Sequence, residues 1–181
     1  NSYATPLNQS PLALGIDMVA HSATKYLNGH SDVVAGALCA SEAIIREVFK
    51  KTYMVCGAVM SPHDAWLMIR GLRTLSVRME RIARTTREVL GFLQAQAKVE
   101  KVYYPNDAAN PQFALTQAQM RGASGLLTVV LRVQDVAGVE RFCNALRRFL
   151  MTVSWGGYES LQFPVCAVYP ADAPLTPSGG G

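Results

Sequence analysis

The chain has 181 residues, of which 50% are hydrophobic and 17% are charged, and its formal net charge is +4. This composition excludes an intrinsically disordered chain, and the length allows one large domain or two small ones with a true hydrophobic core. No apolar run reaches the roughly 18 residues that a membrane-spanning helix needs. The four cysteines form no C-x-x-C pair, so neither a zinc site nor a redox dithiol is predicted, and a reducing compartment is expected.

Positive charge is concentrated between residues 70 and 101, which hold eight Lys/Arg against three Glu. A basic helix face of this kind can contact nucleic acid or can simply be solvated, with ion pairs such as Arg84 to Glu88. Neither interleaved aromatic residues nor a nucleic-acid-binding motif accompanies it. The sequence therefore favours a solvated face and predicts no nucleic-acid partner.

Strand and helix patterns alternate in the first part of the chain. Patterns of apolar residues and turn signals predict the following elements. They are a short helix over 11–14 that Gly15 ends, a strand over 17–23, a turn at Asn28-Gly29, a strand over 33–40 and a helix from Ser41 to about Phe49.

Two helices are predicted next. Ser61-Pro62-His63-Asp64 is a strong helix start, because Ser61 can cap the helix and Pro62 suits the first helical position. The longest helical pattern follows over 74–98, with apolar residues every three to four positions. This helix is expected to bridge two domains.

A second series of strands and helices follows the long helix. The patterns predict strands over 99–104, 126–133 and 151–155, and helices over 111–120 and 136–150. This β-α-β-α-β order indicates a second α/β or α+β domain.

The segment HSATKYLNGHSD, residues 21 to 32, is the candidate for chemistry. Lys25 follows an apolar strand and lies beside the hydroxyls of Ser22 and Thr24. A lysine amine forms a Schiff base with an aldehyde cofactor, and neighbouring hydroxyls can hydrogen-bond the phosphate of that cofactor. Arginine could not replace it, because only the lysine pKa falls readily on desolvation.

Other catalytic templates fit less well. Residues 22 to 25 also match Ser-x-x-Lys, in which a lysine activates a serine nucleophile. That chemistry needs Ser-Asp-Asn and Lys-Thr-Gly strings, but the chain has Ser31-Asp32-Val33 and Lys51-Thr52-Tyr53. The three histidines have no metal-ligand spacing with one another or with cysteine, so no metal site is predicted.

Four segments in order carry a resemblance to a known family. They are HSATKYLNGHSDVVAG (21–36), SPHDAWLMIRGLRTLSVRM (61–79), Tyr104-Pro105 with Asn110-Pro111-Gln112, and SWGGYESLQFP (154–164). Together they resemble the Cys/Met-metabolism enzymes that depend on pyridoxal 5'-phosphate (PLP). This transsulfuration family includes cystathionine γ-synthase, cystathionine β- and γ-lyases, methionine γ-lyase and O-acetylhomoserine sulfhydrylase.

The resemblance implies a role for each matching residue. Lys25 would hold PLP and move protons at the substrate's α-carbon and γ-side, and Ser22 and Thr24 would hydrogen-bond the cofactor phosphate. Ser154 would lie by the lysine and the substrate carboxylate. The implied reaction is elimination or replacement at the β- or γ-carbon of cysteine, cystathionine, methionine or activated homoserine, and the sequence leaves these alternatives open.

The resemblance also implies an organisation. We expect an α/β enzyme of the PLP-dependent transferase-like fold (fold type I), which at full length would be a cytoplasmic homotetramer. Residues 1–76 would be the end of the large PLP-binding domain, and 77–181 most of the small C-terminal α+β domain, with a flexible tail over 172–181.

Several family features have no counterpart in the chain. The Asp that faces the pyridine nitrogen would precede Asn1, and the Arg for the substrate carboxylate would follow Gly181. We therefore expect a C-terminal-half fragment that is inactive alone; the alternative is a non-catalytic globular or interaction module that retains the fold. Trp155 and Tyr158 are bulkier than expected beside Ser154, which suggests a distinctive substrate pocket.

Overall fold

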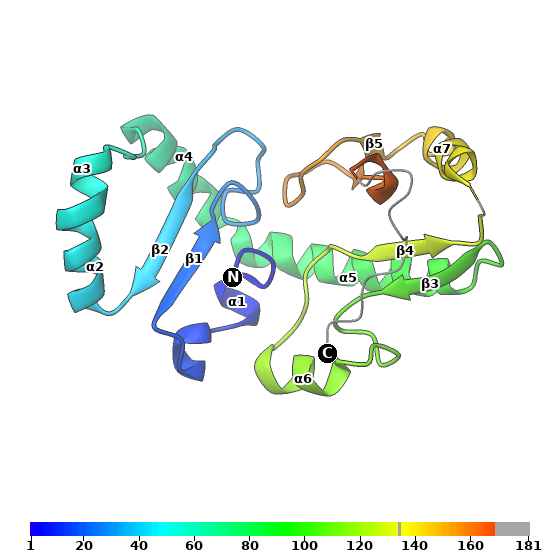
Figure 1. Cartoon of the computed structure of the whole chain (residues 1–181), viewed down its shortest axis with the longest axis horizontal. Coiled ribbons are helices and arrows are strands. Elements are labelled where there is room, and N and C mark those ends of the chain that lie inside the picture. Colours follow the sequence, from blue (N-terminus) through cyan, green and yellow to red (C-terminus); the bar gives the residue numbers. More distant parts are fainter. Residues whose placement is uncertain (134, 169–181) are drawn as a thin grey trace.

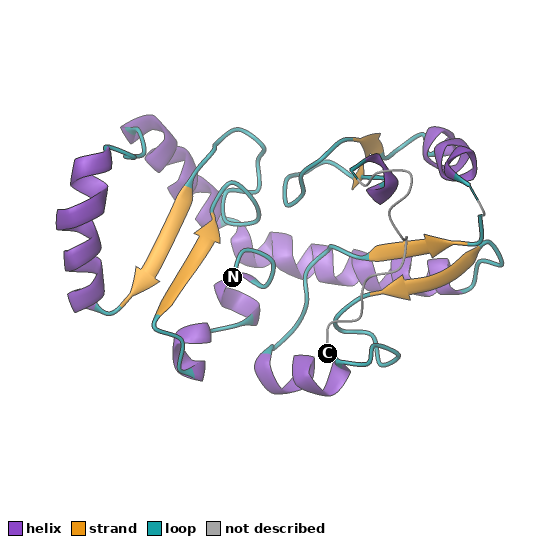
Figure 2. Cartoon of the chain, in the orientation of Figure 1, coloured by secondary structure: helices purple, strands orange, loops and turns teal. Residues whose placement is uncertain are grey.

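A computed structural model of the chain describes residues 1–133 and 135–168 (Figure 1). The tail expected over 172–181 lies outside the described residues. Both halves of the chain contain helices and strands, as Figure 2 shows. No helix among the described residues combines the length and apolar character needed to cross a membrane.

The first half is built around an antiparallel hairpin. Strand β1 (Met18–Ser22) pairs with β2 (Gly36–Ala40), so that Ser22 lies opposite Gly36. The long connection between these strands carries Lys25. The other elements of this half are α1 (Thr5–Asn8), the 3-10 helix η1 (Pro11–Leu14), α2 (Glu42–Val48), the π-helix η2 (Phe49–Tyr53), α3 (Met54–Cys56) and α4 (Pro62–Arg73).

The predicted helix starts and stops of this half are confirmed. The hydroxyls of Ser41 and Ser61 accept hydrogen bonds from the backbone N–H groups of Ile44 and Asp64, as N-caps do. Gly15 ends η1 with φ +90°, a conformation that glycine adopts without strain. The sequence did not predict α1, η2 or α3.

The second half follows the long helix α5 (Leu75–Gln94). It consists of β3 (Val99–Tyr103), α6 (Phe113–Gln119), β4 (Thr128–Leu131), α7 (Val136–Ala145), β5 (Leu150–Met151), β6 (Leu161–Gln162) and the 3-10 helix η3 (Val165–Ala167). Strands β3 and β4 pair antiparallel, and β5 and β6 pair parallel. The predicted order of strands and helices is confirmed, although the sequence did not predict β6.

Several predicted boundaries were wrong. Strand β2 begins at Gly36 rather than at residue 33, because the backbone of Ala35 is hydrogen-bonded to Thr24. Helix α5 ends at Gln94 instead of residue 98, where the N–H of Ala95 bonds back to the last turn. Helix α7 stops at Ala145 because the backbone of Leu146 is extended.

The last predicted strand was also misplaced. It was expected over 151–155, but β5 covers only Leu150–Met151. The reason is that Ser154 has φ +102°, which no strand residue adopts. The chain leaves the strand direction there and turns toward the β1–β2 connection.

Helix α5 contributes to both hydrophobic cores. In the first core Leu75 and Met79 pack with residues of the β1–β2 connection and of α4, and in the second Leu90 packs with Val102 and Tyr104. Figure 1 shows α5 running between the two halves of the molecule. The expected boundary at residue 76 falls near the start of this helix and stays a prediction.

The basic segment is mainly a solvated face. Arg81, Arg84 and Arg87 are exposed, whereas Arg78 is turned toward the β1–β2 connection. The expected ion pair of Arg84 with Glu88 is not formed. The salt bridges of the described residues are Glu42–Arg46, Glu47–Lys51 and Asp32–Arg70.

Helix α4 packs against the β1–β2 connection at a glycine. A Cβ atom at Gly71 would lie 2.4 Å from the carbonyl oxygen of Asn28 and 2.8 Å from its Cα. Both atoms belong to the backbone, so they cannot move aside as a flexible side chain would. Glycine is therefore the residue that allows this close contact.

We predict that Gly71→Ala lowers the free energy of unfolding by about 1–3 kcal/mol, as overpacking of a core does. Chemical denaturation measures the change. Gly91→Ala in α5 is the matched control, because a Cβ there meets nothing within 4 Å. It should raise stability by about 0.5–1 kcal/mol through helix propensity. Equal effects of the two variants would contradict the packing argument.

Candidate active site

Lys25 lies in a single helical turn at the end of β1. The N–H of Asn28 donates to the carbonyl of Ala23 at 2.9 Å, and that of Gly29 donates to the carbonyl of Lys25 at 2.8 Å. Gly29 has φ +71° and ends the turn, as a glycine commonly does at the end of a helix. Hydrogen bonds from the backbone of Asn28 and Gly29 therefore hold the backbone around Lys25 in place.

The structure brings Lys25 together with Ser154, 129 residues later in the chain. Lys25 Nζ donates a hydrogen bond of 2.7 Å to Ser154 Oγ. The same amine lies 5.6 Å from the centre of the Trp155 ring, close enough for a cation–π contact. One fixed amine thus faces a hydroxyl and an aromatic ring.

The two hydroxyls beside Lys25 have different surroundings. Ser22 is exposed at the end of β1, and its hydroxyl makes no hydrogen bond to the described residues. The Thr24 hydroxyl accepts from the N–H of Ala35 at 2.9 Å and donates to the carbonyl of Ala35 at 3.2 Å. The Ser22 hydroxyl is therefore available to a ligand, whereas the Thr24 proton is used within the β1–β2 connection.

Further contacts, which the sequence did not predict, join these two segments. Ser31 Oγ donates to Glu159 Oε2 at 2.7 Å, and the rings of Tyr26 and Trp155 lie 5.3 Å apart at 59°. Gly156 belongs to a Gly-Gly pair, and a Cβ on it would lie 2.9 Å from the carbonyl carbon of Lys25. Only the Gly-Gly pair was visible in the sequence as a signal.

A cavity of about 450 Å³ lies between the two segments. Thr24 and residues 31–34 line one side, and residues 152–155 line the other, with Gly157 and Glu159. Tyr158 does not line it and is 79% exposed. Of the two bulky residues singled out in the sequence, only Trp155 therefore faces the cavity.

The Asp32 carboxyl lines the cavity, and hydrogen bonds from two side chains favour its ionised form. Asp32 accepts hydrogen bonds from Asn28 Nδ2 at 2.8 Å and from Arg70 Nη2 at 2.6 Å. These contacts, with that of Asn28 the larger, lower the pKa of the Asp32 carboxyl. Burial raises the pKa of Tyr26, whose phenol oxygen accepts from the N–H of Gly125.

The donor set fits an aldehyde cofactor that carries a phosphate. A primary amine is held on a fixed turn, and a free hydroxyl lies three residues before it. Thr24 and Ser154 line the cavity, whereas Lys25 and Ser22 do not, and Lys25 adjoins it through its contact with Ser154. An amine is the group that binds an aldehyde covalently, and hydroxyls donate to phosphate.

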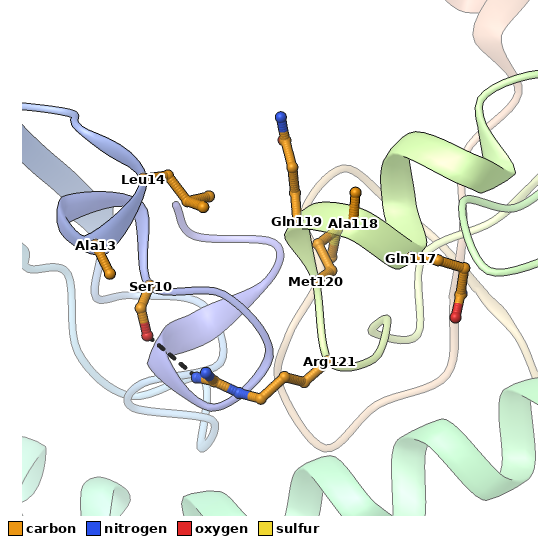
Figure 3. Close-up of a pocket in the computed structure, with 8 residues that line it drawn as sticks. All are labelled: Ser10, Ala13, Leu14, Gln117, Ala118, Gln119, Met120 and Arg121. Carbon is orange, nitrogen blue, oxygen red and sulfur yellow. Dashed lines mark hydrogen bonds between the residues drawn. The ribbon is translucent and has the colours of Figure 1, made fainter.

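A second cavity, of about 230 Å³, lies between the segment around η1 and helix α6 (Figure 3). Its arginine, Arg121, donates to Ser10 Oγ at 3.1 Å and to the carbonyls of Pro6 and Leu7. Figure 3 shows the hydrogen bond from Arg121 to Ser10 as a dashed line. None of the predicted site residues lines this cavity.

Comparisons with known proteins identify the family of the chain. The family model of the Cys/Met metabolism PLP-dependent enzymes matches residues 1–170. The chain is 42% identical to an L-methionine gamma-lyase of Pseudomonas putida and 39% identical to a cystathionine beta-lyase of Coxiella burnetii. The alignments cover 96% and 89% of this chain but only 44% and 42% of those relatives, so the chain spans less than half of their length.

Solved structures show the same likeness. Cystathionine gamma-synthase from Xanthomonas oryzae pv. oryzae, in complex with aminoacrylate and cysteine, superposes with a TM-score of 0.84 at 38% identity, over 89% of this chain and 41% of that one. Cystathionine gamma-lyase from Lactobacillus plantarum, complexed with L-serine, superposes with a TM-score of 0.85 at 32% identity, over 93% of this chain and 44% of that one. The expected fold type I is thereby confirmed, and the chain belongs to the Cys/Met metabolism PLP-dependent enzyme family.

Proposed function

We propose that this chain carries the cofactor lysine of a PLP-dependent transsulfuration enzyme, with Lys25 as the catalytic residue. The observation that carries the proposal is the 2.7 Å contact of Lys25 Nζ with Ser154 Oγ, formed by residues from two family segments. PLP, when bound, supplies an electron sink for the substrate's α-carbon.

The residues of this chain would bind the cofactor and move protons. Lys25 would hold the cofactor through its amine, and the same amine would take and return the proton at the substrate's α-carbon and on the γ-side. Ser22 donates to the cofactor phosphate with its free hydroxyl. Thr24 is the second phosphate-binding residue; its hydroxyl reaches the phosphate by releasing the carbonyl of Ala35.

Ser154 would position the lysine amine and then meet the substrate. Its hydroxyl accepts from Nζ in this structure and so fixes the direction in which the amine points. After the amine moves, the same hydroxyl is free to donate to the substrate carboxylate. This exchange of partners requires Ser154 to stay within reach of Lys25.

The substrates are sulfur amino acids or activated homoserine, and elimination and replacement at the β- or γ-carbon both fit these residues. We propose a cytoplasmic homotetramer at full length, in which residues 1–76 complete the large PLP-binding domain and later residues form most of the small domain. The names of the methionine gamma-lyase and cystathionine beta-lyase relatives support this substrate class.

The first test is covalent trapping of PLP. We expect the full-length protein to gain a visible absorbance band with PLP, and borohydride reduction with peptide mapping to locate the cofactor on Lys25. Lys25→Ala should abolish the band and the adduct. Lys50→Ala, at an exposed lysine outside the site, should leave both unchanged.

The outcome separates the two function classes left open by the sequence. An adduct on Lys25 supports the enzyme. A folded full-length protein that binds no PLP would instead support a non-catalytic module that keeps the family fold.

A second test concerns the glycine that brings Ser154 to Lys25. Gly156 has φ +90°, and a Cβ there would lie within 3.0 Å of backbone atoms of Lys25 and Tyr26. We expect Gly156→Ala to lower the free energy of unfolding by about 1–3 kcal/mol more than Gly15→Ala, and to weaken PLP binding. Gly15 has the same φ but nothing within 4 Å, so it isolates the backbone strain; chemical denaturation that gave equal losses would contradict the close approach.

The Trp155 ring should influence which substrate is used. It lines the cavity and lies 5.6 Å from Lys25 Nζ. We expect Trp155→Leu to change the ratio of kcat/KM for cystathionine and methionine by about tenfold, a typical effect of a reshaped apolar pocket. Tyr158→Leu, at a side chain that does not line the cavity, is the control, and an unchanged ratio in Trp155→Leu would rule out this role.

A further inference from the structure

We infer that Arg78 is a positioning residue for Lys25: its guanidinium fixes the helical turn from which the lysine projects. The inference rests on the proposed function, because it concerns how the cofactor lysine is held. Arg78 is one of the arginines that repeat along 78–87, and the sequence gives it no role of its own.

The guanidinium of Arg78 makes four hydrogen bonds to three segments. Nη1 donates to the carbonyl of Tyr26 at 2.8 Å, and Nη2 donates to those of Gly71 at 2.8 Å and Leu27 at 3.5 Å. Nε donates to Thr74 Oγ1 at 2.9 Å. The side chain thus connects the start of α5, the end of α4 and the turn of Lys25.

The turn needs such a donor. The last carbonyls of a helical turn have no partner within it and must be satisfied from outside. Tyr26 and Leu27 follow Lys25 directly, and both of their carbonyls are bonded to Arg78. A planar guanidinium suits this task because its several N–H groups point in fixed directions.

The neighbouring backbone leaves space for this guanidinium. A Cβ at Gly29 would lie 2.0 Å from Arg78 Nη1, so any other residue there would displace the side chain. Burial lowers the pKa of Arg78. The four acceptors offset this loss of hydration, because hydrogen bonds to a charged group are stronger than neutral ones.

Fixing this turn also fixes the direction in which the Lys25 side chain points. The backbone before the lysine is fixed by β1, and the peptide after it is fixed by Arg78 through Tyr26. With both sides held, Nζ reaches Ser154 Oγ at 2.7 Å. Removing Arg78 would leave the following peptide free to shift and would spread the lysine amine over several positions.

The test compares PLP affinity and the site of borohydride trapping in the full-length protein. We expect Arg78→Met to weaken PLP binding at least tenfold and to lower the share of trapped cofactor on Lys25 relative to the exposed lysines. Arg78→Lys, which can still donate to one carbonyl, should recover part of both. Arg81→Met, at an exposed arginine one turn along α5, should behave as wild type.

Each outcome has a separate meaning. Loss of thermal stability with unchanged PLP affinity and unchanged trapping on Lys25, measured below the melting temperature, would overturn the inference and leave a purely structural arginine. If neither Arg78 variant folds, Thr74→Val decides. It keeps the guanidinium and removes the acceptor of Nε, together with the hydrogen bond that the Thr74 hydroxyl donates to the carbonyl of Gly71. Weaker PLP binding supports the inference, and unchanged binding overturns it. Absence of trapping in the wild type would instead count against the proposed function.

Discussion

The close approach of the chain to the turn around Lys25 is the constraint on which the rest of the structure depends. Backbone atoms of this turn meet Gly156 on one side and Gly71 on another, at distances where a Cβ would overlap them. Glycine is therefore required at both positions. The contact at Gly156 brings Ser154 to the lysine, and the contact at Gly71 seats the turn on helix α4.

This constraint links the stability of the fold to the position of Lys25. The residues that hold the turn, among them Tyr26, are also core residues that pack with α4 and α5. The phenol of Tyr26 further accepts from the N–H of Gly125, which lies in the chain between Ala123 of the second core and Leu127, which packs against that core. A change in either core can therefore alter the position of Lys25 without touching the cavity.

Much of the fold was predictable because it rests on local signals. Ser61-Pro62 marks the start of α4, and regular apolar spacing marks α5. The predicted ends of elements were wrong where a distant residue or an unusual backbone conformation competes with the local pattern. The Thr24 hydroxyl accepts a hydrogen bond from the backbone N–H of Ala35, so β2 begins after Ala35. The positive φ of Ser154 ends the strand that the neighbouring residues favour.

The sequence by itself determined the family segments, the candidate lysine within them and the order of strands and helices, because these follow from residue type and short-range spacing. Only the tertiary structure decided which side chains meet. It fixed the hydrogen bond between Lys25 and Ser154, whose proximity the family resemblance only implied, and it turned Arg78 away from its basic neighbours onto the carbonyls of Tyr26 and Leu27. Contacts between residues far apart in the chain depend on how the backbones pack, and no local pattern carries that information.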